Sequence, residues 1–204
     1  MSKIQVTLPD RTVKTVPSGT TPQDIADSIG PRLAQDVVAA NVNGGLVDLN
    51  LDLQEDCTLE LITGDRVEGH DVLLHSTAHL MAHAVKIIYP DVKITIGPTI
   101  KNGFYYDFDL DDTFSDDDLE KIEKKMRELA TAGHAITRQE ISTEDAIKYF
   151  NGIGETYKVE IIEQIDPEEV ISAYSQDDFT DLCRGPHVSN TKKIKYFKLL
   201  SISG

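Results

Sequence analysis

The chain has 204 residues and carries 20 Lys and Arg side chains against 35 Asp and Glu, which gives a formal net charge of −15. This acidic balance excludes a protein that coats nucleic acid with basic residues. No run reaches the roughly 20 apolar residues of a bilayer span, and residues 1–5 lack the apolar core of a secretory signal. We therefore expect a cytoplasmic protein with Cys57 and Cys183 reduced.

The first sixty or so residues predict a small α+β unit. Its expected elements are two strands, a helix and three further strands, at residues 4–8, 13–16, 22–29, 37–42, 46–47 and 57–63. Thr20 or Thr21 can cap the helix, Gly30-Pro31 ends it, and Asn43-Gly44-Gly45 is a strong hairpin turn. This order is typical of a ubiquitin-like β-grasp domain, which we assign to residues 1–63.

Helical periodicity replaces this pattern after Gly64-Asp65-Arg66, where we expect a second domain at residues 64–204. A long helix is predicted over residues 72–89. The remaining expected elements are extended segments at 92–96 and 104–108, helices after the caps Ser115 and Ser142, and strands at 170–174 and 179–183. The fold class is thus α+β in both domains, with the sheet of the second packed on a long helix.

The predicted long helix carries His75, His79 and His83 at i, i+4 and i+8, so consecutive imidazoles share one face. The segment Cys183-Arg184-Gly185-Pro186-His187 adds a thiol and an imidazole around a turn. The two imidazole nitrogens of a helical His-x3-His pair, together with the thiol of Cys183 and the imidazole of His187, would suit tetrahedral zinc. Packed histidines and a buried cysteine are the alternatives. His70 and His134 are predicted to be surface or packing residues.

Four segments in chain order resemble the editing domain of bacterial threonyl-tRNA synthetases. They are residues 74–79 (Leu-His-Ser-Thr-Ala-His), residues 96–107 with Ile-Gly-Pro and Asn-Gly-Phe-Tyr-Tyr-Asp, residues 157–160 (Tyr-Lys-Val-Glu) and residues 181–187 (Asp-Leu-Cys-Arg-Gly-Pro-His). The first sixty residues resemble the TGS domain that precedes it. One departure is Arg11, which stands where glycine is expected and so argues against a turn with positive φ.

The resemblance implies an aminoacyl-tRNA deacylase that hydrolyses the ester of mischarged seryl-tRNA(Thr), within a parent enzyme that attaches threonine to tRNA using ATP. Its expected catalytic residues are His75, His79, Lys158, Cys183 and His187. Its expected substrate-binding residues are Tyr105, Tyr174 and Asp181. A zinc-dependent hydrolase, a structural zinc module and a non-catalytic tRNA- or partner-binding module are the alternatives.

No cofactor is expected for the chain itself. Zinc at His75, His79, Cys183 and His187 is chemically feasible but not favoured, because the resemblance places the family's zinc, with ATP and Mg²⁺, in a separate catalytic domain. The expected partners are the CCA end of tRNA(Thr) and the catalytic and anticodon-binding domains of the same chain, with no membrane. We expect a monomeric N-terminal fragment, truncated near the end of the editing domain, of a homodimeric parent.

Overall fold

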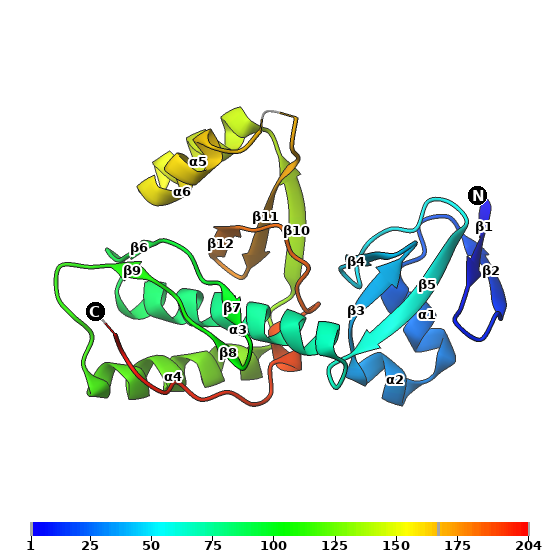
Figure 1. The fold of residues 1–204 in the computed structure, drawn as a ribbon, viewed down its shortest axis with the longest axis horizontal. Helices are drawn as coiled ribbons and strands as arrows, with labels where there is room; N and C mark the ends of the chain where they lie inside the picture. The colour runs from blue at the N-terminus through cyan, green and yellow to red at the C-terminus, as the bar shows by residue number, and fades with distance from the viewer. Residues whose placement is uncertain (1, 167, 204) are drawn as a thin grey trace. The chain divides into compact units, whose positions relative to one another are not determined.

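The structure, a computed structural model, describes residues 2–166 and 168–203 (Figure 1). The chain divides into two compact units. The first unit ends at Leu73 and also includes Gly185–Ser189, and the second consists of Leu74–Arg184 and the residues after Ser189. No helix in the described part of the chain is long and apolar enough to cross a membrane.

The first unit is built on a five-stranded sheet in the order β2-β1-β5-β3-β4, with β1 and β5 parallel. Its elements are β1 (Lys3–Thr7), β2 (Val13–Pro17), α1 (Pro22–Ile29), α2 (Pro31–Asp36), β3 (Val37–Val42), β4 (Gly45–Val47) and β5 (Cys57–Thr63). The predicted ubiquitin-like fold is confirmed. Gly30-Pro31 ends α1 as expected, but Pro31 also starts the short α2, because proline is well tolerated at the first helical position.

The core of this unit lies between α1 and the sheet. Ile4 and Val6 of β1 meet Ile25 and Ala26 of α1 in one buried apolar cluster. Thr21 fixes the start of α1, since its side chain accepts a hydrogen bond from the Asp24 backbone N–H and the Asp24 carboxylate accepts one from the Thr21 N–H. This capping box is the one that the sequence offered through Thr21.

The turn between β1 and β2 contradicts one expectation. Arg11 has a φ of 69°, so the positive-φ turn is present although glycine is not. Asp10 stabilises it, because its Oδ1 accepts a hydrogen bond of 2.9 Å from the Thr12 N–H. The Arg11 N–H also donates to the Leu8 carbonyl at 2.9 Å. Local hydrogen bonds thus hold an L-residue in a conformation that costs roughly 1–2 kcal/mol.

Arg11→Gly is therefore expected to raise the free energy of unfolding by about 0.5–1 kcal/mol, because relief of the left-handed conformation exceeds the extra chain entropy that glycine loses on folding. Urea unfolding followed by circular dichroism measures the change. Arg11→Ala is the matched control, since it removes the same side chain but keeps the Cβ atom. Equal stability of the glycine and alanine variants would show that the turn is not strained.

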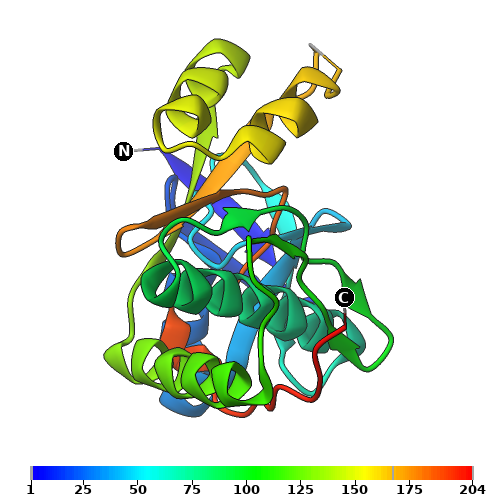
Figure 2. The same cartoon turned by 90° about the vertical axis from the view of Figure 1, so that its left-hand side faces the viewer.

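The second unit contains a three-stranded antiparallel sheet, β10-β11-β12, and two short two-stranded ladders, β6-β9 and β7-β8. Its elements are α3 (Val67–Ile88), β6 (Lys93–Ile94), β7 (Thr99–Ile100), β8 (Gly103–Phe104), β9 (Phe108–Asp109), α4 (Asp116–Ala132), β10 (Ile136–Ile141), α5 (Thr143–Gly152), α6 (Thr156–Glu163), β11 (Ile171–Gln176), β12 (Phe179–Leu182) and the 3-10 helix η1 (Thr191–Lys193). In both views α4 runs along α3 (Figures 1 and 2).

The predicted long helix is present, but α3 begins earlier than expected, at Val67. Gly69 explains the difference. A Cβ atom at this position would lie 2.1 Å from the Thr63 carbonyl oxygen, so only glycine lets the first turn of the helix pack against the end of β5. A glycine that reads as a helix breaker in the sequence is here a requirement of close packing.

The helix caps predicted from Ser115 and Ser142 are confirmed. Ser115 and Asp118 form a capping box at the start of α4, and the Ser142 side chain accepts a hydrogen bond from the Asp145 N–H at the start of α5. Several elements of this unit were not predicted, among them β7, β10, α6 and η1. The strand β10 is mostly polar and exposed, and α6, which begins at Thr156, follows Glu155 without a side-chain cap.

The sheet of this unit presents its two faces to different partners. Asp181 of β12 pairs with Tyr174 of β11, so their side chains lie on the same face, and Phe179 on that face packs with Ala78 and Ala82 of α3. The small alanines let the helix approach the sheet closely. On the opposite face, Ile171 packs with apolar residues of α5 and α6. The helix α6 is thereby held beside the sheet.

Candidate active site

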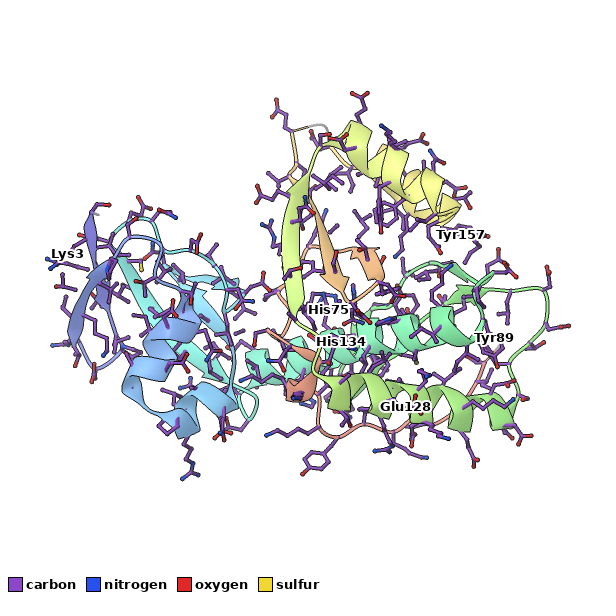
Figure 3. The ribbon with its side chains drawn as sticks, turned by 180° about the vertical axis from the view of Figure 1, so that it is seen from behind. Lys3, His75, Tyr89, Glu128, His134 and Tyr157 are labelled. Atoms are coloured by element: carbon purple, nitrogen blue, oxygen red, sulfur yellow. The ribbon has the colours of Figure 1, made fainter. Side chains whose placement is uncertain are left out.

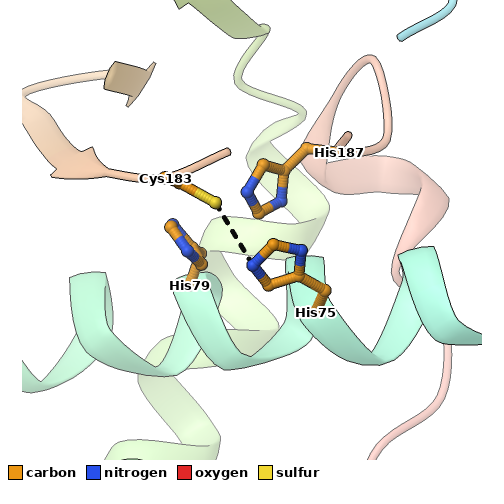
Figure 4. Close-up of side chains that lie close together, drawn as sticks. All are labelled: His75, His79, Cys183 and His187. Carbon is orange, nitrogen blue, oxygen red and sulfur yellow. Dashed lines mark hydrogen bonds between the residues drawn. The ribbon is translucent and has the colours of Figure 1, made fainter. Parts of the chain in front are cut away.

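Two histidines project from the sheet-facing side of α3. His75 and His79 lie one turn apart, with ring centroids 5.1 Å apart and an interplanar angle of 83°. Figures 3 and 4 show the His75 imidazole between the helix and the strands. His83, one turn further on, has a different environment, because its ring stacks on Phe179 at 5.2 Å and its Nε2 lies 3.1 Å from Asp178 Oδ1. His83 is therefore a packed, hydrogen-bonded side chain.

A cavity of about 250 Å³ opens in front of His75 and His79. It lies below the range of roughly 300–1,000 Å³ typical of drug-sized ligand sites. Its lining combines polar groups from α3, α6 and β12 with apolar groups from the segment before β7 and from the segments that flank β11. The lining residues are His75, His79, Thr95, Ile96, Gly97, Tyr106, Lys158, Ile161, Ile165, Glu169, Val170, Ile171, Ser172, Asp181, Leu182, Cys183 and Arg184.

Asp181 is the centre of a buried polar network in this cavity. Its Oδ1 accepts hydrogen bonds from Lys158 Nζ at 2.7 Å and from the Leu182 N–H at 2.8 Å. Its Oδ2 accepts one from the Tyr106 hydroxyl at 2.8 Å and lies 3.8 Å from His79 Nδ1. Asp181 is 2% exposed and Lys158 4%, so this ion pair is shielded from water. The short carboxylate thus fixes the lysine and the tyrosine at one point.

Burial also sets the protonation of two groups here. The pKa of His79 lies well below its usual value, first because the ring is buried and then because His75 and the Lys158 ammonium disfavour a second positive charge. The pKa of Tyr106 is well above its usual value, because the phenol is buried and faces the Asp181 carboxylate. At neutral pH the cavity therefore holds a neutral imidazole beside a protonated phenol.

Cys183 lies at the end of β12, with its Sγ 3.2 Å from His75 Nε2 (Figure 4). The thiol is partly exposed to the cavity rather than fully buried. The sequence alone showed no base dedicated to this cysteine. The structure supplies one, because an imidazole nitrogen at this distance can exchange a proton with the thiol.

His187 belongs to the segment 185–189 and its backbone N–H donates to Asp48 Oδ1 at 2.8 Å. The nitrogen and sulfur atoms of His75, His79, Cys183 and His187 lie within 4.8 Å of one another (Figure 4). These donor types suit zinc, but 4.8 Å exceeds the separation of roughly 3.5 Å that tetrahedral Zn–N and Zn–S bonds of about 2.1–2.3 Å imply. Cys183 Sγ and His75 Nε2 already lie 3.2 Å apart, so only more widely separated donors would have to approach one another to hold a cation.

Comparisons with known proteins agree with this description. Residues 4–63 match the TGS domain, and residues 171–204 match the threonyl and alanyl tRNA synthetase second additional domain. The two matched stretches follow one another in that order along the chain. The resemblance to threonyl-tRNA synthetases that the sequence motifs indicated is thereby confirmed.

Relatives named threonine–tRNA ligase match all or nearly all of the chain. It is 52% identical over 204 residues to the protein of Citrifermentans bemidjiense, 50% over 204 residues to that of Pelobacter propionicus, and 47% over 203 residues to that of Symbiobacterium thermophilum. Each alignment covers 100% of the chain but 31–32% of the relative. The chain thus spans about a third of the length of these ligases.

Of the eight site residues predicted from the sequence, five line the cavity, and Tyr105, Tyr174 and His187 are not among its lining residues. Tyr105 is 46% exposed, and Tyr174 is buried beside Asp181 in the sheet. Tyr106 lines the cavity instead. The missed signal is the alternation of Phe104, Tyr106 and Phe108, which pack into one cluster and leave Tyr105 on the outer side.

Gly97 holds the Tyr106 ring in place by lacking a side chain. A Cβ atom on Gly97 would lie 2.1 Å from Tyr106 Cδ2 and 2.4 Å from Cε2. Those contacts are far shorter than van der Waals distance, and the buried ring cannot yield without moving its hydroxyl away from Asp181. Gly97 therefore positions Tyr106 at the cavity, beside Asp181.

Gly97→Ala is expected to lower the free energy of unfolding by about 1–3 kcal/mol through overpacking and to displace the Tyr106 hydroxyl from Asp181. The second effect is read from the near-ultraviolet circular dichroism of the tyrosines in the folded variant. Gly103→Ala is the matched control, because a Cβ atom there meets no other atom within 4 Å. A Gly97→Ala variant with the stability and spectrum of the Gly103→Ala variant would contradict the proposed contact.

Proposed function

We propose that this chain is a post-transfer editing module that hydrolyses the ester between serine and the terminal ribose of tRNA(Thr). The observation that carries the proposal is the single cavity in which His75, His79, Lys158, Asp181 and Cys183 meet. The relatives' name, threonine–tRNA ligase, supplies the amino acid and the tRNA. The proposed substrate follows from the combination of these two findings.

A ligase for threonine needs such an activity because serine lacks only one methyl group. A pocket gains roughly 1–3 kcal/mol from a methyl group, which is too little to exclude the smaller amino acid from the aminoacylation site. A separate hydrolytic site that accepts the serine ester provides the missing discrimination. The small cavity volume is suited to a serine ester with part of its ribose rather than to a whole nucleotide.

Ester hydrolysis requires an oriented water, donors for the developing oxyanion and a proton for the departing ribose hydroxyl. In our proposal the neutral His79 orients and deprotonates the water, because a ring with a lowered pKa keeps its lone pair at neutral pH. Lys158 stabilises the oxyanion. Its ammonium carries three donors, of which contacts to Asp181 and Tyr106 account for two.

Asp181 then acts on the substrate mainly through its neighbours. Asp181 is among the expected substrate-binding residues, but both of its oxygens already accept hydrogen bonds from protein groups. We propose that it orients Lys158 and Tyr106. His187 remains our second candidate for proton transfer to the ribose oxygen, and Tyr174 supports Asp181 from the neighbouring strand.

Cys183 has two proposed roles that an experiment separates. It is either part of the cavity wall that orients water, or a nucleophile that His75 activates at 3.2 Å. We favour the wall, because direct attack by water needs no thioester. Hydroxylamine added during a single turnover would trap a seryl thioester as serine hydroxamate. Hydroxylamine also cleaves the ester of seryl-tRNA directly, so serine hydroxamate is measured against a reaction without protein. An excess over that background with the unchanged chain, and none with Cys183→Ala, would establish the covalent route.

A zinc-dependent hydrolase is the second candidate function, and the group of four ligand atoms favours it. Elemental analysis of the purified chain and deacylation after dialysis against a chelator distinguish the two functions. We expect the rate of serine release to remain within twofold after chelation. Stoichiometric zinc whose removal abolishes serine release would favour the metal enzyme.

The proposed partners follow from the proposed editing function. The cavity receives the CCA end of tRNA(Thr), and ATP, Mg²⁺ and Zn²⁺ belong to the catalytic domain of the longer ligase, together with its anticodon-binding domain. We propose a cytoplasmic location, a monomeric state for the chain and dimerisation of the ligase through its other domains. Weak, salt-sensitive tRNA binding by this chain is expected, because its net charge is −15.

The deciding experiment incubates the chain with serine-charged and threonine-charged tRNA(Thr) and measures the release of each amino acid. We expect rapid release of serine and slow release of threonine. His75→Ala should lose the activity while its circular dichroism spectrum stays native. Equal release of the two amino acids, or none above the spontaneous rate, would contradict the proposal.

A further inference from the structure

An ion pair stands at the mouth of the cavity. Arg184 Nη2 lies 2.6 Å from Glu169 Oε1, and both residues belong to the cavity lining. Their side chains are 79% and 39% exposed, in contrast to 5% and 2% for Lys158 and Asp181. The lining thus contains one buried ion pair at its floor and one exposed pair at its entrance.

The two pairs differ in how readily they can exchange partners. The buried pair is held by two further donors, the Tyr106 hydroxyl and the Leu182 N–H, and is shielded from water. The exposed pair contributes at most about 1 kcal/mol, because water and salt screen both charges. The contact joins one guanidinium nitrogen to one carboxylate oxygen, so a phosphate that engages the planar fork of Arg184 through two N–H groups can displace Glu169.

The class of anion follows from the size of the cavity. At about 250 Å³ it is below the range of roughly 300–1,000 Å³ for drug-sized sites, so an ester at the floor leaves the rest of its nucleotide at the mouth. The charged group of a nucleotide is its phosphodiester. Apolar Ile96 and Val170, 50% and 59% exposed, also line the cavity and are suited to the uncharged parts of the same nucleotide.

We propose that Arg184 binds the phosphodiester of the terminal nucleotide of the aminoacylated RNA, and that Glu169 competes with this phosphate for the guanidinium. The inference rests on the proposed editing function and names the part of the substrate that the mouth recognises. It also explains how an acidic chain binds RNA at this site, since one unneutralised Arg is exposed once Glu169 is displaced. Glu169 raises the selectivity for RNA substrates, because a ligand without a phosphate cannot displace the Glu169 carboxylate from Arg184.

The test compares two substrates that share one ester. Seryl-tRNA(Thr) carries the terminal phosphodiester, and 3′-seryladenosine does not. Arg184→Ala is expected to lower kcat/KM for seryl-tRNA about five- to tenfold more than for seryladenosine, mostly through KM. Glu169→Gln is expected to raise kcat/KM for seryl-tRNA relative to seryladenosine. It removes the negative charge that competes with the phosphate and keeps the shape of the side chain.

Arg66→Ala is the matched control. It breaks an ion pair with Glu60 of comparable exposure, 55% and 40%, at 3.0 Å and outside the cavity lining. In this variant the ratio of kcat/KM for seryl-tRNA to kcat/KM for seryladenosine should equal the ratio for the unchanged chain. If Arg184→Ala and Glu169→Gln shift the ratio in the same direction, the ion pair has a structural role and Arg184 does not bind phosphate. Equal losses on both substrates would show a contact to the aminoacyl group, and either result would overturn the proposal.

A binding measurement separates this inference from the editing function. A fluorescent, single-stranded RNA ending in CCA is titrated with the chain at several salt concentrations, without any ester present. Arg184→Ala should reduce the slope of log Kd against log salt by about 0.7, the value for one phosphate contact on a single strand. An unchanged slope would reject the phosphate contact even if the chain hydrolyses seryl-tRNA. A reduced slope would support it even if no ester is cleaved.

Discussion

Asp181→Asn is expected to lower the free energy of unfolding of the second unit by about 3–5 kcal/mol and to abolish serine release. The substitution keeps the shape of the side chain but removes its charge. Lys158 would then keep a buried ammonium, 4% exposed, without its partner at 2.7 Å. The Tyr106 hydroxyl and the Leu182 N–H would compete for one remaining carbonyl oxygen. Urea unfolding and the seryl-tRNA assay measure the two losses.

The double variant Lys158→Met with Asp181→Asn is the informative control. It removes both charges, and replacing a whole buried ion pair by uncharged groups is often neutral for stability. We therefore expect the double variant to be more stable than Asp181→Asn alone, yet inactive, because no ammonium remains at the cavity floor. Exposed Lys125→Met with Glu128→Gln, a surface pair at 2.6 Å, should change neither property. If Asp181→Asn were as stable as the unchanged chain, the pair would not be desolvated.

The fold was predictable from the sequence where local chemistry decides it. The capping residues Ser115 and Ser142 mark helix starts by hydrogen bonds that form within three residues. Alternating apolar residues likewise revealed the strands of the first unit. The helix α6 was missed, because it is short, starts without a side-chain cap and has packing against β11 as its main support. The sequence nearby does not encode that support.

The candidate site was predictable in its residue types but not in its contacts. The i, i+4 spacing predicts that His75 and His79 lie on one face of the helix. The meeting of Lys158 with Asp181 depends on how α6 and β12 pack, which no local pattern reveals. For Tyr106 the alternation with Phe104 and Phe108 did carry the signal. Tyr105, the predicted substrate-binding residue, is 46% exposed and lies on the other side of that extended segment.

At Arg11 a local residue preference predicted the wrong backbone conformation. The sequence argued against a positive φ because glycine was absent, yet the Asp10 side chain and the Leu8 carbonyl impose it. A residue preference of 1–2 kcal/mol is roughly the size of one or two hydrogen bonds, so it yields when the surrounding strands fix the turn. Preferences of this size predict a turn type only when no tertiary contact opposes them.

His79→Gln is expected to lower kcat for serine release about 10²- to 10⁴-fold, the usual contribution of a positioned acid–base group. Glutamine keeps a polar side chain in a position that is 7% exposed, so the loss should not come from unfolding. His70→Gln is the matched control, because His70 is exposed and does not line the cavity. A His79→Gln variant with unchanged kcat would leave the deprotonation of water to another group.

The pH dependence gives this prediction a second, independent readout. Burial, His75 and Lys158 lower the pKa of His79 in the folded chain below its usual value of 6.5. Between that lowered pKa and 6.5 the unfolded chain binds more protons at this residue than the folded chain does. The stability that depends on neutral His79 is therefore complete above pH 6.5 and is lost as pH falls toward the folded pKa, with a slope of up to about 1.4 kcal/mol per pH unit.

The kcat for serine release should also fall as pH decreases. The water-activating lone pair of His79 persists until pH falls well below 6.5, so the acid limb of the kcat profile is expected at lower pH than a free imidazole would give. His79→Gln should also flatten the decline of unfolding free energy below pH 6.5, whereas His70→Gln should leave it unchanged. A kcat limb centred at 6.5, or an unaltered stability slope in His79→Gln, would show that the ring is hydrated. The neutral base at the cavity floor would then have to be sought in His75.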